Sequence, residues 1–385
     1  MQEPALNLKK HAKYFQLCLT SLPSYAQGAD SNKLALIYFC LHGLALTGRL
    51  NFSPEEKLDY AGFILDHLIS DPNEEIQSFR QSLSFKLEAK PKNYDLPNLS
   101  ATLFALYNLL ILECNYAKIL DRHKIMKFVR KCQVDLGPEK GAFVPALDPD
   151  GKLLGETDLR HCYIAASIRK LCKYDQLPYE DRTNDINVEN LKNFLLDRLG
   201  ITGGFSSLKY AEPHLGLTFC ALATFRVLDI KLPQQIYDTV IDFLCRRQVD
   251  HPKYTKKDYE PWESEQIGGF NGRINKSSDA CYSWWCTASL CMLDRKLLRL
   301  VNIPSAVKFL LHSCQNEIVG GFAKDFYSSP DPLHSYLALA SLALWTPDYL
   351  IPYVEKKDSL QDIDEALVIT KELKSFFETF VHFDV

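Results

Sequence analysis

The sequence predicts an all-α protein, an α/α barrel in which six inner and six outer helices alternate around a closed ring. Two observations predict this fold. Segments rich in small apolar residues recur six times, and a more amphipathic segment lies between successive copies. A long repeat of this kind indicates helix pairs that stack side by side to bury their apolar faces. We therefore expect a single domain over residues 1–385, with the repeats at about 9–345 and a C-terminal helical extension at about 346–385.

The inner helices are predicted where apolar and small residues occupy all sides of the helix. The segment 219–223 is typical, with the sequence Phe-Cys-Ala-Leu-Ala. Helices that are apolar most of the way round are buried, and alanine, serine and cysteine allow close approach. No strand pattern competes with this interpretation. The six segments open, at intervals of 55 to 66 residues, near Asn32, Asn98, Asp158, His214, Asp279 and His334.

The outer helices are predicted from segments with one polar face. Four of them precede a glycine-phenylalanine turn, as at 203–205 and 268–270. Glycines commonly stop helices because they permit backbone angles that other residues avoid. The six outer segments are Leu8–Leu22, Glu55–Ile69, His123–Cys132, Val188–Leu199, Gln234–Gln248 and Ser305–Gln315.

Composition and missing motifs exclude several classes of protein. The net charge of −4 gives no sign of a nucleic-acid surface, so an anion site must be a local cluster of cations. The longest apolar run, at about Leu99–Leu112, is too short for a transmembrane segment. No glycine-rich phosphate loop is present. The polar N-terminus does not resemble a signal peptide, so the twelve cysteines indicate reduced thiols in a cytoplasmic protein.

A closed ring would bring polar residues from distant repeats together. In a ring the openings of the inner helices meet at one end of the barrel. These openings carry Asn98, Asp158 with Arg160, His214, Asp279 with Cys281, and His334. We therefore expect one pocket to be shared by residues nearly two hundred positions apart.

Asp279, Cys281 and His334 are candidate metal ligands. Three protein ligands with one open position are typical of a catalytic zinc site. The alternative is that His334 caps its helix and Cys281 is part of the core.

A second group of residues suits an anion. Arg273, Lys276 and Tyr282 lie in one segment, with His214 one repeat earlier and Lys324 one repeat later. Cations neutralise phosphate oxygens, and tyrosine and histidine donate further hydrogen bonds. The alternative is a solvated turn, but the neighbouring Trp284-Trp285 pair favours a pocket.

Apolar side chains on the inner helices, including Tyr38 and Phe39, either belong to the core or line a cavity for a long hydrocarbon. The carboxylates Asp362, Asp364 and Glu365 lie outside the repeats in a polar stretch, where we expect a solvated helix start.

These residues resemble a known family. The block 272–285, the run 214–220, Asp158-Leu159-Arg160 and the segment 320–334 are similar to the β subunits of protein prenyltransferases, most closely those of the type I geranylgeranyl enzymes. The resemblance extends from about Lys9 to Leu344, and the first block is highly specific.

The resemblance implies one zinc ion per β subunit, bound by Asp279, Cys281 and His334. It implies diphosphate binding and catalysis by His214, Arg273, Lys276 and Tyr282, with Lys324 as a further catalytic residue. It also implies an obligate heterodimer with an α subunit that supplies another lysine. The substrates would be geranylgeranyl diphosphate and Rho-type small GTPases that end in a CaaX box, with leucine or phenylalanine last.

Two positions separate the subfamilies. Ala35 stands where farnesyltransferases place a tryptophan that shortens the lipid tunnel, so a twenty-carbon chain should fit. Lys324 stands where related enzymes carry a magnesium-binding aspartate, and its ammonium would replace the ion, so Mg²⁺ should not be required.

The remaining sites are also implied by the resemblance. The family pattern departs at Leu215, Asn98 and His161, and these departures bear on selectivity for the last peptide residue. The expected isoprenoid-binding residues are Ala35, Tyr38, Arg160, Tyr163, Gly216, Leu217, Cys220 and Trp285. The expected peptide-binding residues are Asn98, Ser100, Glu156, Arg160, His161 and Leu333.

Two other functions remain open. A non-catalytic helical scaffold would bind proteins without zinc or lipid diphosphate. A farnesyltransferase-like subunit is the second, and Ala35 and Lys324 argue against it.

Overall fold

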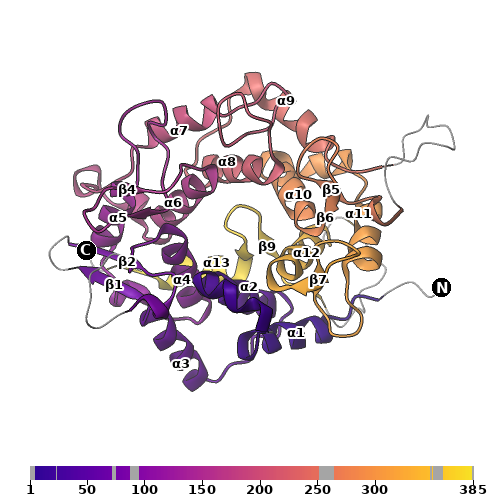
Figure 1. Ribbon diagram of the computed structural model, residues 1–385, viewed down its shortest axis with the longest axis horizontal. Helices are drawn as coiled ribbons and strands as arrows, with labels where there is room; N and C mark the ends of the chain where they lie inside the picture. Colours follow the sequence, from indigo (N-terminus) through magenta and orange to yellow (C-terminus); the bar gives the residue numbers. More distant parts are fainter. Residues whose placement is uncertain are drawn as a thin grey trace.

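The inner layer is a closed ring of helices (Figure 1). The computed structural model describes residues 5–22, 24–71, 75–86, 95–250, 264–346, 349 and 359–383. Each inner helix packs on the next one, and the last packs on the first, so the predicted α/α barrel is confirmed. The inner helices are α2 (Lys33–Leu46), α4 (Leu99–Ile111), α6 (Leu159–Leu171), α8 (Leu215–Val227), α10 (Ala280–Asp294) and α12 (Pro332–Trp345).

The outer layer follows the predicted amphipathic segments. The last outer helix is short and continues as a π-helix over Phe309–Cys314. The outer helices are α1 (Leu8–Thr20), α3 (Pro54–Leu65), α5 (Arg122–Lys131), α7 (Val188–Asp197), α9 (Gln234–Cys245) and α11 (Ile303–Lys308).

The ring of outer helices is closed by α1, which contacts the last repeat. Lys10 Nζ donates to the Glu317 carbonyl at 2.6 Å, and Tyr14 Oη donates to the Pro330 carbonyl at 2.8 Å. The ring of His11 lies between two partners, Gln315 Oε1 at 3.0 Å and the Gly321 N–H at 2.9 Å. The first helix of the chain therefore serves as the outer helix of the final repeat.

The glycine-phenylalanine turns allow neighbouring repeats to approach closely. Gly203 has φ of +94°, and a Cβ there would lie 2.0 Å from the Thr239 carbonyl oxygen of α9. Gly320 has φ of +83°, and a Cβ there would lie 2.4 Å from the Lys10 carbonyl oxygen of α1. The same glycine position thus fits against the next outer helix, including at the ring closure.

Short antiparallel strand pairs connect the helices, which the sequence did not predict. Their register is local, for example Phe270 with Asp279 and Phe322 with Asp331. The pairs are β1 (Leu68–Asp71) with β2 (Ile76–Phe79), β3 (Ala146–Leu147) with β4 (Leu153–Leu154), β5 (Phe270–Asn271) with β6 (Ser278–Asp279), and β7 (Phe322–Ala323) with β8 (Pro330–Asp331). Short 3₁₀ segments lie at Ser24–Asn32, Leu83–Phe85, Tyr116–Lys118, Tyr174–Gln176, Tyr179–Asp181, Ser264–Gln266 and Arg295–Leu300.

The C-terminal segment differs from the expectation. Asp364 is buried and lies in the hairpin of β9 (Ile363–Asp364) and β10 (Ile369–Thr370), before α13 (Lys371–Phe380). Figure 1 shows this hairpin, in yellow, inside the ring. The prediction of a helix start at Asp362–Glu365 is wrong, because the segment forms a hairpin and α13 begins only at Lys371. Asp362 is solvated as expected, whereas Asp364 is buried next to Ile363.

In the described part of the chain, none of the helices is apolar over enough residues to cross a membrane.

Candidate active site

Each inner helix from α4 to α12 begins at a polar side chain that caps it. These side chains accept hydrogen bonds from N–H groups of the first turn, which have no partner within the helix. The capping residues are Asn98, Asp158, His214, Asp279 and Asp331.

Backbone hydrogen bonds connect these helix starts around the ring. The Leu215 N–H donates to the Gly272 carbonyl, and the Ala280 N–H donates to the Lys324 carbonyl, both at 2.8 Å. Each helix start is thereby joined to the loop before the next inner helix. The caps therefore lie at one end of the barrel, which we call the rim.

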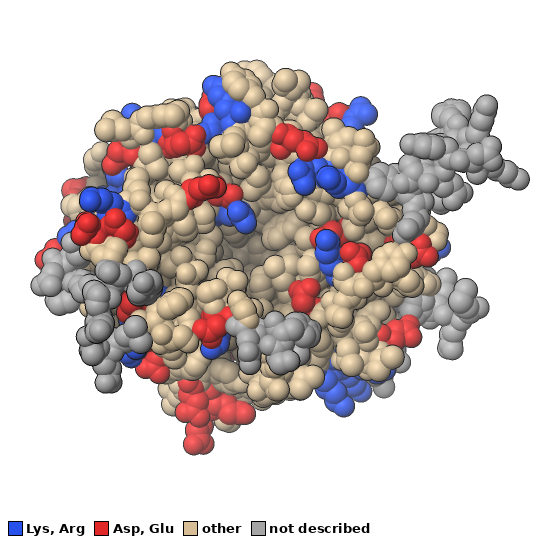
Figure 2. Space-filling view, viewed as in Figure 1, with Lys and Arg blue, Asp and Glu red and all other residues tan. Residues whose placement is uncertain are grey.

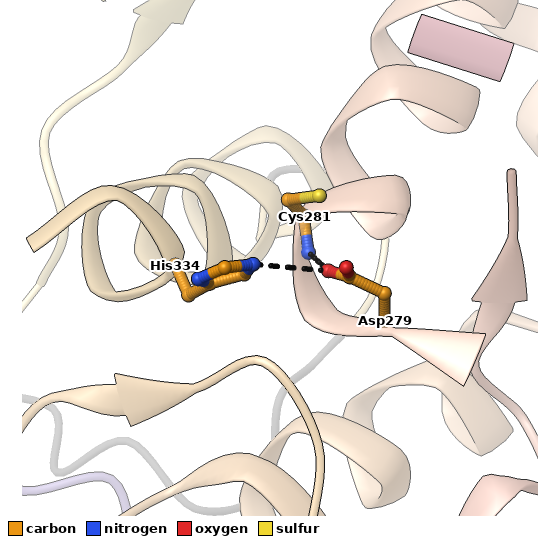
Figure 3. A group of neighbouring side chains, drawn as sticks. All are labelled: Asp279, Cys281 and His334. Carbon is orange, nitrogen blue, oxygen red and sulfur yellow. Dashed lines mark hydrogen bonds and ion pairs between the residues drawn. The ribbon is translucent and has the colours of Figure 1, made fainter. Parts of the chain in front are cut away.

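The structure brings the three candidate metal ligands together on the rim (Figure 3). One donor atom each from Asp279, Cys281 and His334 lies within 4.8 Å of the other two. His334 Nε2 is 3.3 Å from Asp279 Oδ1, and the same carboxylate oxygen accepts the Cys281 N–H at 2.8 Å. The helix cap therefore also orients the carboxylate.

Asp331 is a functional candidate that the sequence analysis missed. The last inner helix begins just after it, slightly earlier than the predicted opening at His334. Its Oδ2 is 2.5 Å from His334 Nδ1. This contact fixes the ring with Nε2 toward Asp279, as carboxylates do for histidines that bind metals. The sequence offered one signal for this role, because Asp331 lies three residues before the candidate ligand His334 at the start of a predicted helix.

The donor set fits a zinc ion. Burial disfavours the charged form of His334, but hydrogen bonds to Asp279 and Asp331 outweigh burial and raise its pKa to about 12. The protonated imidazole thus supplies positive charge that the carboxylates require, and a dication can supply that charge instead. A thiolate, an imidazole and a carboxylate are typical zinc ligands, with a fourth position left for another group.

His214 and Tyr282 form a second pair on the rim. His214 Nδ1 accepts the Gly216 N–H at 3.1 Å, so the proton of the neutral ring resides on Nε2. Burial and the nearby Arg273 guanidinium lower the His214 pKa, which favours this neutral form. Nε2 then donates to Tyr282 Oη at 3.1 Å and leaves the phenol O–H free to donate to a ligand.

Gly272 makes room for this phenol. A Cβ at position 272 would lie 2.4 Å from Tyr282 Oη. The glycine of the block 272–285 is therefore required by the close approach of the Tyr282 ring.

The expected cations lie in rim loops beside these groups. Arg273 and Lys276 are exposed in the loop between β5 and β6, and Arg273 Nη1 is 3.7 Å from Glu212 Oε2. Lys324 is exposed after β7, and its carbonyl receives the N–H of Ala280, the first residue of α10. These three cations therefore lie in loops next to the helix starts that carry the metal ligands and His214.

Behind the rim the barrel is hollow (Figure 2). Aromatic rings of neighbouring inner helices pack on one another, with the Phe219 ring centroid 4.7 Å from that of Trp285 and 5.9 Å from that of Tyr163. Phe39 and Phe104 remain partly accessible although they lie on inner helices. The expected isoprenoid residues are distributed over α2 (Ala35, Tyr38), α6 (Arg160, Tyr163), α8 (Gly216, Leu217, Cys220) and α10 (Trp285).

The expected peptide-binding residues also lie at helix starts on the rim. Arg160 forms a two-point ion pair with Asp158, at 2.9 and 3.0 Å, so its guanidinium is fixed beside the cap of α6. The set occupies the starts of α4 (Asn98, Ser100), α6 (Arg160, His161) and α12 (Leu333), and the loop before α6 (Glu156).

Comparison with known proteins gives a consistent result. A family model described as the prenyltransferase alpha-alpha toroid domain matches residues 6–369. The chain belongs to this prenyltransferase family.

Two curated members of the prenyltransferase family are similar over nearly the whole chain. The geranylgeranyl transferase type-1 subunit beta of Dictyostelium discoideum is 30% identical over 396 residues, which covers 98% of this chain and 99% of the relative. The subunit of the same name from Arabidopsis thaliana is 28% identical over 370 residues, or 91% and 88% of the two chains.

A solved prenyltransferase structure is also similar. The Candida albicans protein geranylgeranyltransferase-I complexed with GGPP matches with a TM-score of 0.89 and 47% identity, covering 98% of this chain and 100% of that one. The resemblance to prenyltransferase β subunits of the type I class is thus confirmed.

Proposed function

We propose that this chain is the catalytic β subunit of a protein geranylgeranyltransferase of type I, acting in the cytoplasm as a heterodimer with an α subunit. It transfers the geranylgeranyl group from its diphosphate to the cysteine of a CaaX box ending in leucine or phenylalanine, with Rho-type small GTPases as substrates. The observation that supports this most is the shared rim, which carries both a zinc-type triad and the His214–Tyr282 pair at one end of a hollow barrel.

Asp279, Cys281 and His334 would hold one zinc ion, with Asp331 holding the histidine ring in place. Zinc, when bound, lowers the pKa of the acceptor cysteine so that it is a nucleophilic thiolate at neutral pH.

The remaining rim residues bind and stabilise the leaving diphosphate. The free Tyr282 O–H donates to a phosphate oxygen, while His214 holds the phenol in position. Arg273, Lys276 and Lys324 supply positive charge as the bond between C1 and oxygen breaks. Donors fixed in place before reaction stabilise developing charge more than mobile solvent does, so this is electrostatic catalysis rather than proton transfer.

Lys324 explains why Mg²⁺ would not be required. Its backbone carbonyl accepts the N–H of Ala280 at the start of α10, so residue 324 lies beside the chain segment that carries Asp279 and Cys281. An ammonium group on this residue would neutralise the diphosphate and repel a second metal ion.

The peptide would bind across the starts of α4, α6 and α12. Ser100 and Leu333 would contact the CaaX side chains near Asn98 and His161, and Arg160 and Glu156 would position the chain terminus. The Asp158 ion pair holds Arg160 in one orientation, which favours recognition of a carboxylate or a backbone carbonyl.

The test is co-expression with a prenyltransferase α subunit, followed by transfer to CaaX peptides from farnesyl and geranylgeranyl diphosphates, with and without Mg²⁺. We expect thioether formation with the twenty-carbon substrate, one zinc per heterodimer, and no dependence on Mg²⁺. Preference for the fifteen-carbon substrate would favour a farnesyltransferase. Absence of transfer and of zinc from a folded heterodimer would favour a scaffold.

A further inference from the structure

The ring-closing helix α1 and the inner helix α2 pack on each other in antiparallel orientation. The last turn of α1, which includes Cys18, lines the same surface pocket as Lys33 and Ile37 near the start of α2. Further along, the two helices approach closely, because a Cβ at Gly43 of α2 would lie 2.4 Å from the Phe15 ring of α1. Later residues of α1 therefore meet earlier residues of α2.

Two cysteines meet at this contact between the helices. Cys18 lies one helical turn after Phe15, and Cys40 lies one turn before Gly43. In antiparallel helices these two steps lead to the same level, because residues three apart share one face of a helix. The two thiols are free, and their side chains are hydrogen-bonded to each other.

The two thiols differ in acidity. The hydrogen bond to the Cys40 side chain is the main cause that lowers the Cys18 pKa, and it outweighs burial, which raises that pKa. The Tyr14 hydroxyl provides a further hydrogen bond that lowers the Cys18 pKa. The contact with Cys18, together with burial, raises the Cys40 pKa well above its usual value. Cys18 is therefore the member of the pair that forms a thiolate more readily, while Cys40 keeps its proton.

Access to solvent also differs between the two cysteines. Cys18 is partly exposed and lines a surface pocket of about 440 Å³, together with Leu36, Tyr60 and Phe63. Cys40 is only 1% exposed. A small oxidant can reach the Cys18 sulfur through this pocket, whereas protein covers Cys40. Cysteines that sense oxidants are accessible, acidic and placed next to a resolving cysteine.

We propose that Cys18 and Cys40 form a redox-sensitive pair, in which a hydroperoxide oxidises Cys18 and Cys40 then closes a disulfide between α1 and α2. The Cys18 thiolate attacks the terminal peroxide oxygen, the O–O bond breaks, and the leaving oxygen takes up a proton, so Cys18 becomes a sulfenic acid. The Cys40 sulfur then attacks the Cys18 sulfur, and the hydroxyl group leaves as water with the Cys40 proton. Two thiols are thereby oxidised to one disulfide, and one peroxide is reduced.

The disulfide would act on the closure of the outer ring. α1 contacts the last repeat through Lys10, His11 and Tyr14, and Tyr14 lies one helical turn before Cys18. A covalent link to α2 prevents α1 from opening away from the inner helix by itself, so local opening of the ring closure becomes rarer in the oxidised protein. This inference goes beyond the proposed function, because it concerns the ring closure rather than lipid transfer.

The test treats the purified, zinc-loaded heterodimer with hydrogen peroxide, alkylates the remaining thiols and maps the peptides by mass spectrometry. We expect peptides linked through Cys18 and Cys40, with the loss of two hydrogen atoms, and we expect dithiothreitol to separate them. Cys40→Ser should stop at the sulfenic acid, which dimedone traps on Cys18. Cys18→Ser should leave Cys40 reduced, because the oxidant does not reach it. Hydrogen exchange of the α1 amides should slow severalfold in the linked protein.

Cys114→Ser is the matched control. Cys114 is also partly exposed, but burial raises its pKa. This variant should form the link between Cys18 and Cys40 at the rate of the unmodified protein. The proposal is overturned if Cys18 remains fully alkylated after peroxide treatment, if it stops at the sulfenic acid while Cys40 is present, or if Cys114→Ser also prevents the link. Unchanged hydrogen exchange of α1 in the linked protein would overturn the effect on the ring closure.

Discussion

The metal-type triad contains a partly buried histidine and the ring closure a fully buried one, and their surroundings have opposite effects on the histidine pKa. His334 lies between two carboxylates, and its pKa is raised to about 12. His11 is buried between an amide and a backbone N–H, and burial lowers its pKa to about 4. The carboxylates around His334 favour a positive charge, whereas the surroundings of His11 favour a neutral ring. Complete hydrogen bonding of a neutral histidine marks a structural contact, whereas excess negative charge marks a binding site for a cation.

The strongest test of this contrast is Cys281→Ala, which removes one ligand from the triad. We expect zinc to fall from one ion per heterodimer to an undetectable level, and transfer to fall with it, because two protein ligands are too few for a stable site. Metal analysis of the purified heterodimer measures the first effect. Cys286→Ala is a control, since Cys286 is a buried residue one helical turn further on. Stoichiometric zinc in Cys281→Ala would remove the metal assignment.

Tyr282→Phe tests the second rim pair. Loss of the hydroxyl that we propose to donate to the diphosphate should lower kcat by roughly 10²-fold, because a fixed donor to developing charge is lost. Single-turnover kinetics separate this effect from binding. Gly272→Ala should reproduce part of the loss by displacing the same ring. An unchanged kcat in Tyr282→Phe would contradict the role given to the phenol.

Asp331→Asn sharpens the contrast at His334 itself. The amide keeps the shape of the side chain but removes its negative charge, so zinc affinity should fall roughly 10- to 100-fold. Competition with a chelator measures this change directly. Asp325→Asn, in the preceding loop, provides a carboxylate control. Equal affinity in Asp331→Asn and the unmodified protein would show that the contact at 2.5 Å does not tune the site.

Lys324→Asp tests the cation in the rim loop. The carboxylate should create a dependence on millimolar Mg²⁺, because the diphosphate then lacks a fixed counter-charge. Transfer rates across a magnesium titration provide the measurement. Independence of Mg²⁺ in this variant would argue against the role of Lys324.

The smallest expected effect concerns His11. Its folded pKa lies below the usual value of 6.5, so the unfolded chain binds the proton more readily between these values. The stabilisation is complete above about pH 6.5 and is lost as pH falls toward 4. It amounts to about 3 kcal/mol, since each pH unit contributes about 1.4 kcal/mol.

His11→Gln should reduce this acid sensitivity, because an amide can both accept from Gly321 and donate to Gln315 without titrating. Thermal unfolding midpoints at pH 7.5 and pH 5 compare the two proteins. The difference isolates His11 from other buried histidines such as His42. Identical pH dependence in both proteins would contradict this account.

The sequence predicted the repeating parts of the molecule well. The inner and outer helices follow from hydrophobic periodicity, and ring closure then brings Asp279 and His334 together from different repeats. The resemblance added Ala35 and Lys324, whose roles remain predictions.

The parts that failed depend on contacts outside the repeat. From the sequence alone Asp364 is expected to be a solvated carboxylate. In the structure it is buried, because it accepts the Leu367 N–H within the hairpin and pairs with Lys374. No local pattern shows that the Tyr38 hydroxyl donates to a carbonyl 330 residues later, while the expected contact of its ring with lipid stays a prediction. Asp331 was overlooked because its value lies in orienting another side chain.

The closure through α1 also has a consequence for biosynthesis. His11 meets Gly321 across 310 positions of sequence. At translation speeds of roughly 5–20 residues per second, the segment around Gly321 is therefore synthesised about 15–60 s after α1. During that interval α1 can already pack on α2 through Phe15, but Lys10, His11 and Tyr14 have no native partner from the final repeat, so the ring of outer helices stays open.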